Sequence, residues 1–85
     1  MTQMEAFARL AVNGSFSKTA DEMYLTQPAI SLAISRMEDE LSVTLFTRSF
    51  KKAEMTDEGK KLFRYVHPII KNYYAINEVF ANHHI

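Results

Sequence analysis

The sequence contains no cysteine and only two glycines and two prolines in its 85 residues. Without cysteine the chain can form neither a disulfide framework nor a thiolate metal site, and we expect it to work in a reducing compartment, the cytoplasm. The scarcity of glycine and proline leaves long uninterrupted stretches for helices and little room for a fold rich in sheet. These absences predict a mainly α-helical domain.

Long apolar runs and an excess of one charge are also missing. No 18 apolar residues stand together, and the first residues lack a charged segment followed by an apolar one, so we expect neither a membrane span nor a secretory signal. The ten basic and ten acidic residues give a formal net charge of +0. Because phosphate affinity comes from clustered Lys and Arg, binding to a nucleic acid would depend on where these cations lie.

Apolar residues recur at three- and four-residue spacing and predict three helices, over residues 2–12, 18–23 and 27–41. The last two are joined by a turn of about three residues, and the outer face of the third begins with small, polar or basic residues. This pattern is typical of a helix-turn-helix. The expected core residues of the three helices are Met4, Phe7, Leu10 and Ala11, then Phe16, Ala20 and Met23, then Ile30, Ile34, Met37 and Leu41.

Local signals predict where these helices begin and end. Gly14 follows the first helix, where glycine adopts the left-handed cap conformation at low cost. Ser17 and Thr26 each offer a hydroxyl to cap the second and third helices. Pro28 is compatible with the first turn of the third helix, because first-turn amides have no partner within the helix.

A short hairpin is expected after the third helix. Residues 44–48 and 53–56 form two short segments around the tip Ser49-Phe50-Lys51-Lys52. With its two lysines this tip is basic. The pattern therefore predicts a two-stranded wing beside the helix-turn-helix, in a domain of residues 1–56.

Residues 57–85 are expected to form one long helix, with Thr56 as its N-cap. Its apolar residues repeat with a mean spacing of 3.5, which is typical of a helix that packs along a partner helix. Pro68 lies inside this helix and predicts a kink. The seam, which we expect to form a homodimer interface, consists of Leu62, Val66, Ile69, Tyr73, Ile76 and Phe80.

Several runs of residues are more specific than helical periodicity requires. They are Gly14-Ser15-Phe16-Ser17, Ala20, Met23, Thr26-Gln27-Pro28-Ala29-Ile30-Ser31, Ile34, Met37-Glu38, Leu41, Leu45-Phe46, Arg48, Lys51, Met55-Thr56 and Gly59. Over nearly the whole chain this pattern resembles the N-terminal domain of LysR-type transcriptional regulators. The most specific parts are Gln-Pro-Ala-Ile-Ser at 27–31 and the Leu-Phe-x-Arg and Thr-x-x-Gly motifs around the wing.

The resemblance implies a winged helix-turn-helix that regulates transcription by binding double-stranded DNA, without a cofactor. It implies a homodimer that pairs through the long linker helix and recognises a pseudo-palindromic site. Full-length regulators of this type are usually tetramers with a C-terminal effector-binding domain, which this sequence does not contain.

The resemblance also implies which residues contact DNA. The third helix would enter the major groove, where Gln27 can pair with adenine and Leu32 can touch a thymine methyl. The start of the second helix would meet phosphate, and the wing would hold the backbone or the neighbouring minor groove. The complete set is Ser15, Ser17, Lys18, Thr26, Gln27, Pro28, Ser31, Leu32, Ser35, Arg36, Arg48, Lys51 and Lys52.

Three positions depart from the pattern common in this family. Ser42 follows Leu41 where glycine is common, which predicts a strained or differently shaped turn. Leu32 stands where a basic or long polar residue is frequent, which predicts altered sequence specificity. Pro68 interrupts a helix that is usually continuous, so the dimer geometry stays open.

Single features of the sequence also allow other interpretations. The aromatic residues Tyr65, Tyr73, Tyr74 and Phe80 could stack on bases, but their heptad-like spacing favours packing against another helix. His83 and His84 lack nearby carboxylates, so we expect no metal site. No nucleophile elbow, phosphate-binding loop, dinucleotide fingerprint or metalloprotease motif is present, so we expect no enzyme. A module that docks another protein is the main alternative to a DNA-binding domain.

Overall fold

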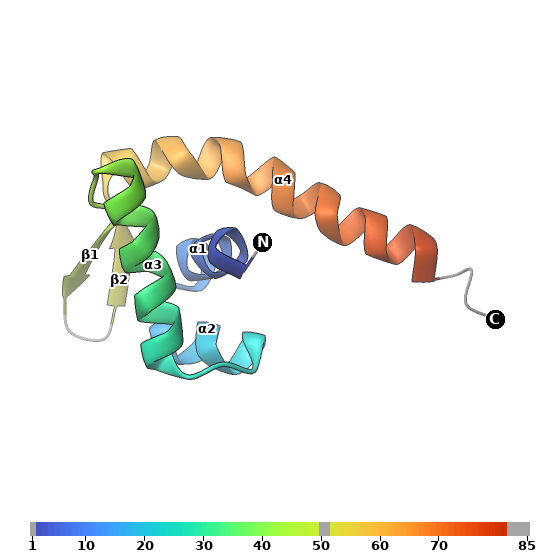
Figure 1. Cartoon of the computed structure of the whole chain (residues 1–85), viewed down its shortest axis with the longest axis horizontal. Coiled ribbons are helices and arrows are strands. Elements are labelled where there is room, and N and C mark those ends of the chain that lie inside the picture. The colour runs from blue at the N-terminus through green and yellow to red at the C-terminus, as the bar shows by residue number, and fades with distance from the viewer. Residues whose placement is uncertain (1, 50–51, 82–85) are drawn as a thin grey trace.

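The structure is a computed structural model that describes residues 2–49 and 52–81. Figure 1 shows three helices packed together, a hairpin at one end, and a long helix that crosses this unit and extends beyond it. Its elements are α1 (Thr2–Asn13), α2 (Phe16–Met23), α3 (Gln27–Leu41), β1 (Phe46–Ser49), β2 (Lys52–Met55) and α4 (Asp57–Ala81). The mainly α-helical architecture with a two-stranded wing and a long last helix is therefore confirmed.

The core forms around α1, which contacts α2, α3, β2 and α4. Phe7 is fully buried, and its ring lies 5.5 Å from that of Phe46 and 6.4 Å from that of Phe63, measured between centroids. Such tilted aromatic contacts add to the free energy gained by burying the rings. The buried apolar residues are Ala6, Phe7, Ala8, Leu10, Ala20, Ile30, Ile34, Met37, Leu45, Phe46, Ala53, Val66 and Ile70.

Most of the expected core residues are buried or packed against the core, but the prediction for Leu41 is wrong, because this side chain is 49% exposed. The cause lies in how α3 ends. The Ser42 amide donates to Asp39 O and the Val43 amide donates to Glu38 O at 3.1 Å, which are the two hydrogen bonds of a Schellman motif. This turn brings Val43 onto the core in place of Leu41.

The caps confirm two of three predictions. Thr26 Oγ1 accepts a hydrogen bond from the Ala29 amide at 3.2 Å, and Thr56 Oγ1 accepts one from the Gly59 amide at 3.0 Å. The prediction for Ser17 is wrong: α2 begins at Phe16, and Ser15 is its N-cap, with Ser15 Oγ accepting from the Lys18 amide at 3.1 Å. The helix starts earlier than the apolar spacing suggested because the chain turns already at Gly14, which has φ +70°.

The wing is anchored to the end of α3 by a carboxylate. Glu38 Oε2 accepts hydrogen bonds from the backbone amides of Leu45, at 2.7 Å, and Phe46, at 3.4 Å. The two antiparallel strands then pair from Phe46 opposite Met55 to Ser49 opposite Lys52, a slightly different range from the expected 44–48 and 53–56. The first strand starts later because the Leu45 amide binds Glu38 rather than the opposite strand.

The start of α4 is packed too closely against the wing for any residue larger than glycine at position 59. A Cβ added to Gly59 would lie 2.3 Å from Leu45 O. The hydroxyl of Thr56 binds both Thr44 O and the Gly59 amide, and the Thr56 amide donates to Leu45 O at 2.9 Å. This explains physically why threonine and glycine stand three positions apart here.

The first part of the long helix α4 packs on the core, and its last part is exposed to solvent. Val66 and Ile70 are buried at 3% and 5% exposure, and Leu62 packs against the same core, so Leu62 and Val66, two residues of the expected seam, already pack within their own chain. Each of residues 71–81 is exposed. The helix continues through Pro68, and Figure 1 shows its second half turning away from the line of its first half, as the expected kink requires. No helix in residues 2–49 and 52–81 is long and apolar enough to span a membrane.

We expect that Ser42→Gly stabilises the domain by about 0.5–1 kcal/mol. Ser42 has φ 56°, a left-handed conformation that costs a residue with a Cβ about 1–2 kcal/mol. Glycine avoids this cost, but the greater conformational freedom of glycine in the unfolded chain offsets part of the gain. Urea unfolding followed by circular dichroism measures the change. The matched control Ser35→Gly, inside α3, should instead destabilise by about 0.5 kcal/mol. A Ser42→Gly variant no more stable than the parent would show that the turn is not strained.

Candidate nucleic-acid interface

The N-terminal ends of α2 and α3 and the wing surround one open groove. Its volume is about 920 Å³. Seven of the thirteen residues expected from the sequence to contact DNA line it, although they come from three elements far apart in the chain. The described lining residues are Ser15, Phe16, Ser17, Gln27, Pro28, Ser31, Arg48 and Lys52.

The start of α3 presents side chains rather than backbone donors to this groove. Pro28 has no N–H, and the Ala29 amide is bound by the Thr26 cap. Gln27 and Ser31 therefore supply the polar groups on this side of the groove. An amide and a hydroxyl can each donate and accept hydrogen bonds, which is the chemistry needed to recognise the edges of bases.

The charges of the groove are of one sign. Arg48 and Lys52 line it, and no carboxylate is among its described lining residues. The acidic residues Glu38, Asp39 and Glu40 lie at the other end of α3. The neutral net charge of the chain therefore conceals a local excess of positive charge where α2, α3 and the wing meet.

The remaining predicted contacts lie outside the described lining of the groove. Leu32 and Arg36 are exposed on α3, Ser35 is half-buried there, and Thr26 is exposed at the cap. Lys18 is exposed on α2 and borders a different hollow, between α1, α2 and α4. Lys51 lies outside the described residues. The groove thus brings together the start of α2, the start of α3 and the wing, but not the whole predicted set.

Phe16 lines the groove but is not among the residues that the sequence predicts to contact DNA. Its spacing with Ala20 and Met23 placed it in the expected core, and it does pack against the core. It also borders the groove, where the guanidinium carbon of Arg48 lies 4.5 Å from the centre of its ring. Its position between two serines at the start of a short helix was the one signal in the sequence that could have indicated this role.

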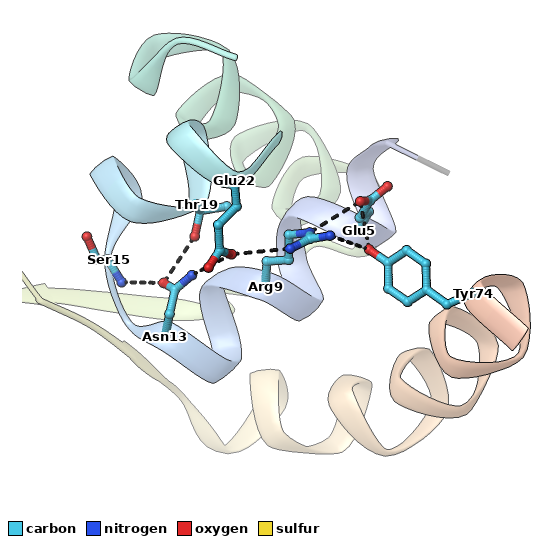
Figure 2. Close-up of polar contacts among 7 residues, drawn as sticks. All are labelled: Glu5, Arg9, Asn13, Ser15, Thr19, Glu22 and Tyr74. Carbon is cyan, nitrogen blue, oxygen red and sulfur yellow. Dashed lines mark hydrogen bonds and ion pairs between the residues drawn. The ribbon is translucent and has the colours of Figure 1, made fainter. Parts of the chain in front are cut away.

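A polar network behind the groove joins α4 to α1 and α2 (Figure 2). The Tyr74 hydroxyl donates to Glu5 Oε2 at 2.7 Å and accepts from Arg9 Nη2 at 2.8 Å. Arg9 also pairs with Glu5 at 3.2 Å and with Glu22 at 3.3 Å. Tyr74 is 69 positions from Glu5, so sequence periodicity, which assigned it to an aromatic stripe, could not reveal the contact.

The same network reaches the cap of α2. Asn13 Nδ2 donates to Glu22 Oε1 at 3.3 Å, while Asn13 Oδ1 accepts from the Ser15 amide at 2.8 Å and from the buried Thr19 hydroxyl at 3.1 Å. Figure 2 shows these residues linked in a row from Ser15 to Tyr74. The distal half of α4 is thereby connected through side chains to the edge of the groove.

A second exposed surface lies on α4. Ile69, Tyr73, Ile76 and Phe80 are between 38% and 60% exposed and fall on one face of the helix at the spacing expected for a seam. Val79, which is not among the predicted seam residues, is 57% exposed and borders a shallow hollow with Ile76 and Phe80. Within residues 2–49 and 52–81, no group of three or more acidic or histidine side chains could hold a metal ion. His83 and His84 are outside that range.

Residues 1–60 match the family model described as bacterial regulatory helix-turn-helix protein, lysR family. Over 70 residues the chain is 40% identical to a protein from Cyanidioschyzon merolae named as a probable RuBisCO transcriptional regulator, a match that covers 82% of this chain and 23% of that protein. The chain therefore spans less than a quarter of the length of this relative.

Two solved structures confirm the fold. The BenM DNA-binding domain in a complex with catB site 1 DNA has a TM-score of 0.82 at 25% identity, over 95% of this chain and 90% of that chain. A mutant of OxyR from Corynebacterium glutamicum has a TM-score of 0.85 at 25% identity, over 98% of this chain and 26% of that chain. The winged helix-turn-helix with a long last helix is therefore shared with both.

We expect Tyr74→Phe to destabilise the domain by about 0.5–1 kcal/mol, because the hydroxyl that binds Glu5 and Arg9 is lost from a partly exposed site. Tyr65→Phe, at an exposed tyrosine of the same helix, is the matched control and should change the free energy of unfolding by less than about 0.3 kcal/mol. Denaturant unfolding monitored by circular dichroism gives both values. Equal effects at the two positions would contradict a structural role for the network.

The contribution of Tyr74 should also depend on pH. Burial, and then the hydrogen bond to Glu5, raise the pKa of Tyr74 above its usual value and outweigh the opposite effect of Arg9. The folded state therefore retains the phenolic proton more strongly than the unfolded chain, in which the pKa is about 10. The stabilisation is present below pH 10 and is lost as pH rises through the higher pKa of the folded state. The difference between parent and Tyr74→Phe should shrink accordingly above pH 10.

Proposed function

The chain belongs to the lysR family of bacterial regulatory helix-turn-helix proteins, and we propose that it binds double-stranded DNA sequence-specifically as the DNA-binding part of a transcriptional regulator. The groove formed by the starts of α2 and α3 and by the wing carries this proposal, because it combines base-reading polar groups with two cations and no described carboxylate. The BenM domain, which has the same fold, was solved bound to DNA.

In this proposal the N-terminal half of α3 enters the major groove. Gln27 and Ser31 hydrogen-bond to base edges, and Pro28 and Leu32 make apolar contacts, for example to thymine methyl groups. Thr26 at the cap, and Ser35 and Arg36 further along α3, contact the flanking bases or backbone. Leu32 supports an apolar contact because half of its surface is exposed.

The other elements contact the DNA backbone and so fix the position of α3 along the major groove. Ser15, Ser17 and Lys18 meet phosphate at the start of α2, where the helix dipole favours an anion. Arg48 and Lys52, together with Lys51, hold the next phosphates or the adjacent minor groove. Contacts of this kind position the protein, while α3 reads the sequence.

We further propose that two chains pair through α4, mainly by the exposed residues Ile69, Tyr73, Ile76 and Phe80. These side chains are exposed and none belongs to the buried core, so a second helix can cover them without disturbing the core. Two-fold symmetry of such a homodimer predicts a pseudo-palindromic DNA site. In this arrangement residues 1–56 bind DNA, residues 57–85 form the dimerising linker, and a longer regulator would assemble further, into a tetramer.

The first test is selection of the domain on random duplex DNA, followed by titration of the recovered site at two salt concentrations. The logarithm of the association constant should fall with the logarithm of salt by about 0.9 for each phosphate contacted. Lys52→Ala should reduce this slope by about 0.9 and weaken binding several-fold, whereas Lys60→Ala, at an exposed lysine of α4, should change neither. No enriched sequence at low salt, from a folded dimer, would instead favour a module that docks another protein.

Pairing through α4 has its own test, sedimentation of Ile76→Asp beside the parent. A carboxylate in the centre of an apolar seam should abolish pairing, because an isolated buried charge costs several kcal/mol. The variant should have the mass of one chain where the parent has the mass of two. Lys71→Asp, on a different face of α4 by the helical repeat of 100° per residue, is the control and should remain paired. An unchanged mass for Ile76→Asp would remove this face from the interface.

A further inference from the structure

The contact between Phe16 and Arg48 links α2 to the wing at the edge of the groove. The guanidinium carbon lies 4.5 Å from the centre of the phenyl ring, well inside the distance of about 6 Å at which a cation is attracted to an aromatic face. Phe16 is the first residue of α2 and rests partly on the core, so its ring is a firm support. Arg48 is exposed on β1.

The backbone fixes both ends of this contact. The Ala53 amide donates to Gly14 O at 2.8 Å, and Ala53 lies directly opposite Arg48 in the hairpin. Gly14 is two positions before Phe16, so this hydrogen bond ties the start of α2 to the residue that lies opposite Arg48. A Cβ at Gly14 would lie 3.4 Å from Ala53 O, and its φ of +70° disfavours any other residue. The distance between Phe16 and Arg48 is therefore set by the framework rather than by the side chains alone.

The chemistry of the contact leaves Arg48 free to bind an anion. A guanidinium held against a ring by cation–π attraction does not spend its N–H donors on a hydrogen-bond acceptor, so they stay available to other groups. Within the described part of the chain, the ion pairs are Arg9 with Glu5, Arg9 with Glu22 and Lys61 with Glu58, and none involves Arg48. Its charge is therefore held in place by an uncharged partner and is not neutralised.

We infer that Phe16 is a positioning residue for DNA binding, whose ring holds the Arg48 guanidinium at the groove so that its N–H edge meets an acceptor on DNA. The inference rests on the proposed function, because that function supplies the ligand of Arg48. A long side chain ordered before binding loses less conformational entropy when it binds. The role of Phe16 is thus to order the Arg48 side chain before binding, rather than to contact DNA.

The pre-ordering can be tested on the free protein by nuclear magnetic resonance. Protons at the end of the Arg48 side chain should show ring-current shifts to low frequency in the parent. These shifts should disappear in Phe16→Leu, which keeps an apolar side chain but has no ring. Arg48 protons at random-coil positions in the parent would overturn the inference. This measurement needs no DNA, so it is independent of whether the proposed function is right.

The consequence for binding is tested by a double-mutant cycle on the selected DNA site. Phe16→Leu should weaken binding about 3- to 10-fold, as expected for loss of one cation–π contact and its ordering effect. In an Arg48→Ala background the same substitution should have less than about a 2-fold effect, since its target is gone. Phe16→Tyr, which keeps an aromatic face, should bind within about 2-fold of the parent. A loss that persists without Arg48 would overturn the inference.

If circular dichroism shows that Phe16→Leu does not fold, Arg48→Lys provides the measurement in its place. Lysine keeps the charge but has no flat face to lie on the ring. Binding should weaken by a similar factor of about 3 to 10, with an unchanged salt slope because the number of cations is unchanged. Parent affinity in Arg48→Lys would overturn the inference. If the parent itself selects no DNA, the proposed function is contradicted instead. The nuclear magnetic resonance test would still show whether the Phe16 ring orders Arg48.

Discussion

Burial of Phe7 is the interaction on which the rest of this small domain depends. Its ring is fully buried where α1 meets the wing and α4, and it contacts Phe46 and Phe63 from those two elements. Burying one such side chain contributes about 1.5–3 kcal/mol, a large share of the few kcal/mol that a core of this size can supply. The contact joins α1 to the wing and to α4, and so helps to hold the wing at its place beside the groove.

The wing has no apolar core of its own and is held by hydrogen bonds to the backbone at its ends. Glu38 binds the amides that lead into β1, the hydroxyl of Thr56, directly after β2, donates to Thr44 O, before β1, and Gly14 O accepts from the amide of Ala53. Two strands of four residues would be marginal in isolation. Because three separate elements hold it, the wing can present Arg48 and Lys52 at a defined place beside α2 and α3.

Charge is organised in the same local way. The chain is neutral overall, but Arg48 and Lys52 line the groove, while Glu38, Asp39 and Glu40 lie at the far end of α3 and Glu5 and Glu22 belong to the network around Arg9. That network uses Glu5 and Glu22 to orient Arg9 on Tyr74, so these carboxylates are kept away from the groove. A surface of this kind gives steering by a local field without the self-repulsion of a strongly charged domain.

The sequence by itself determined the features that depend on neighbours along the chain. The helices, the Thr26 and Thr56 caps, the hairpin and the bend of the last helix follow from periodicity, capping chemistry and proline geometry, which act within a few residues. The convergence of Ser15, Gln27 and Arg48 was available only through resemblance to a family, because nothing local brings these three segments together.

Only the tertiary structure decided which of two equivalent positions is buried. Val66 and Ile69 both fit the apolar repeat of α4, yet Val66 is in the core and Ile69 is exposed, because the core lies on the side of Val66 and Ile70, while Ile69, about 100° from Ile70 around the helix, faces away. Likewise Glu38, Phe16 and Tyr74 find partners 7, 32 and 69 positions away along the chain. Such contacts depend on how the elements pack. An apolar repeat indicates that a face is buried but does not indicate which partner covers it.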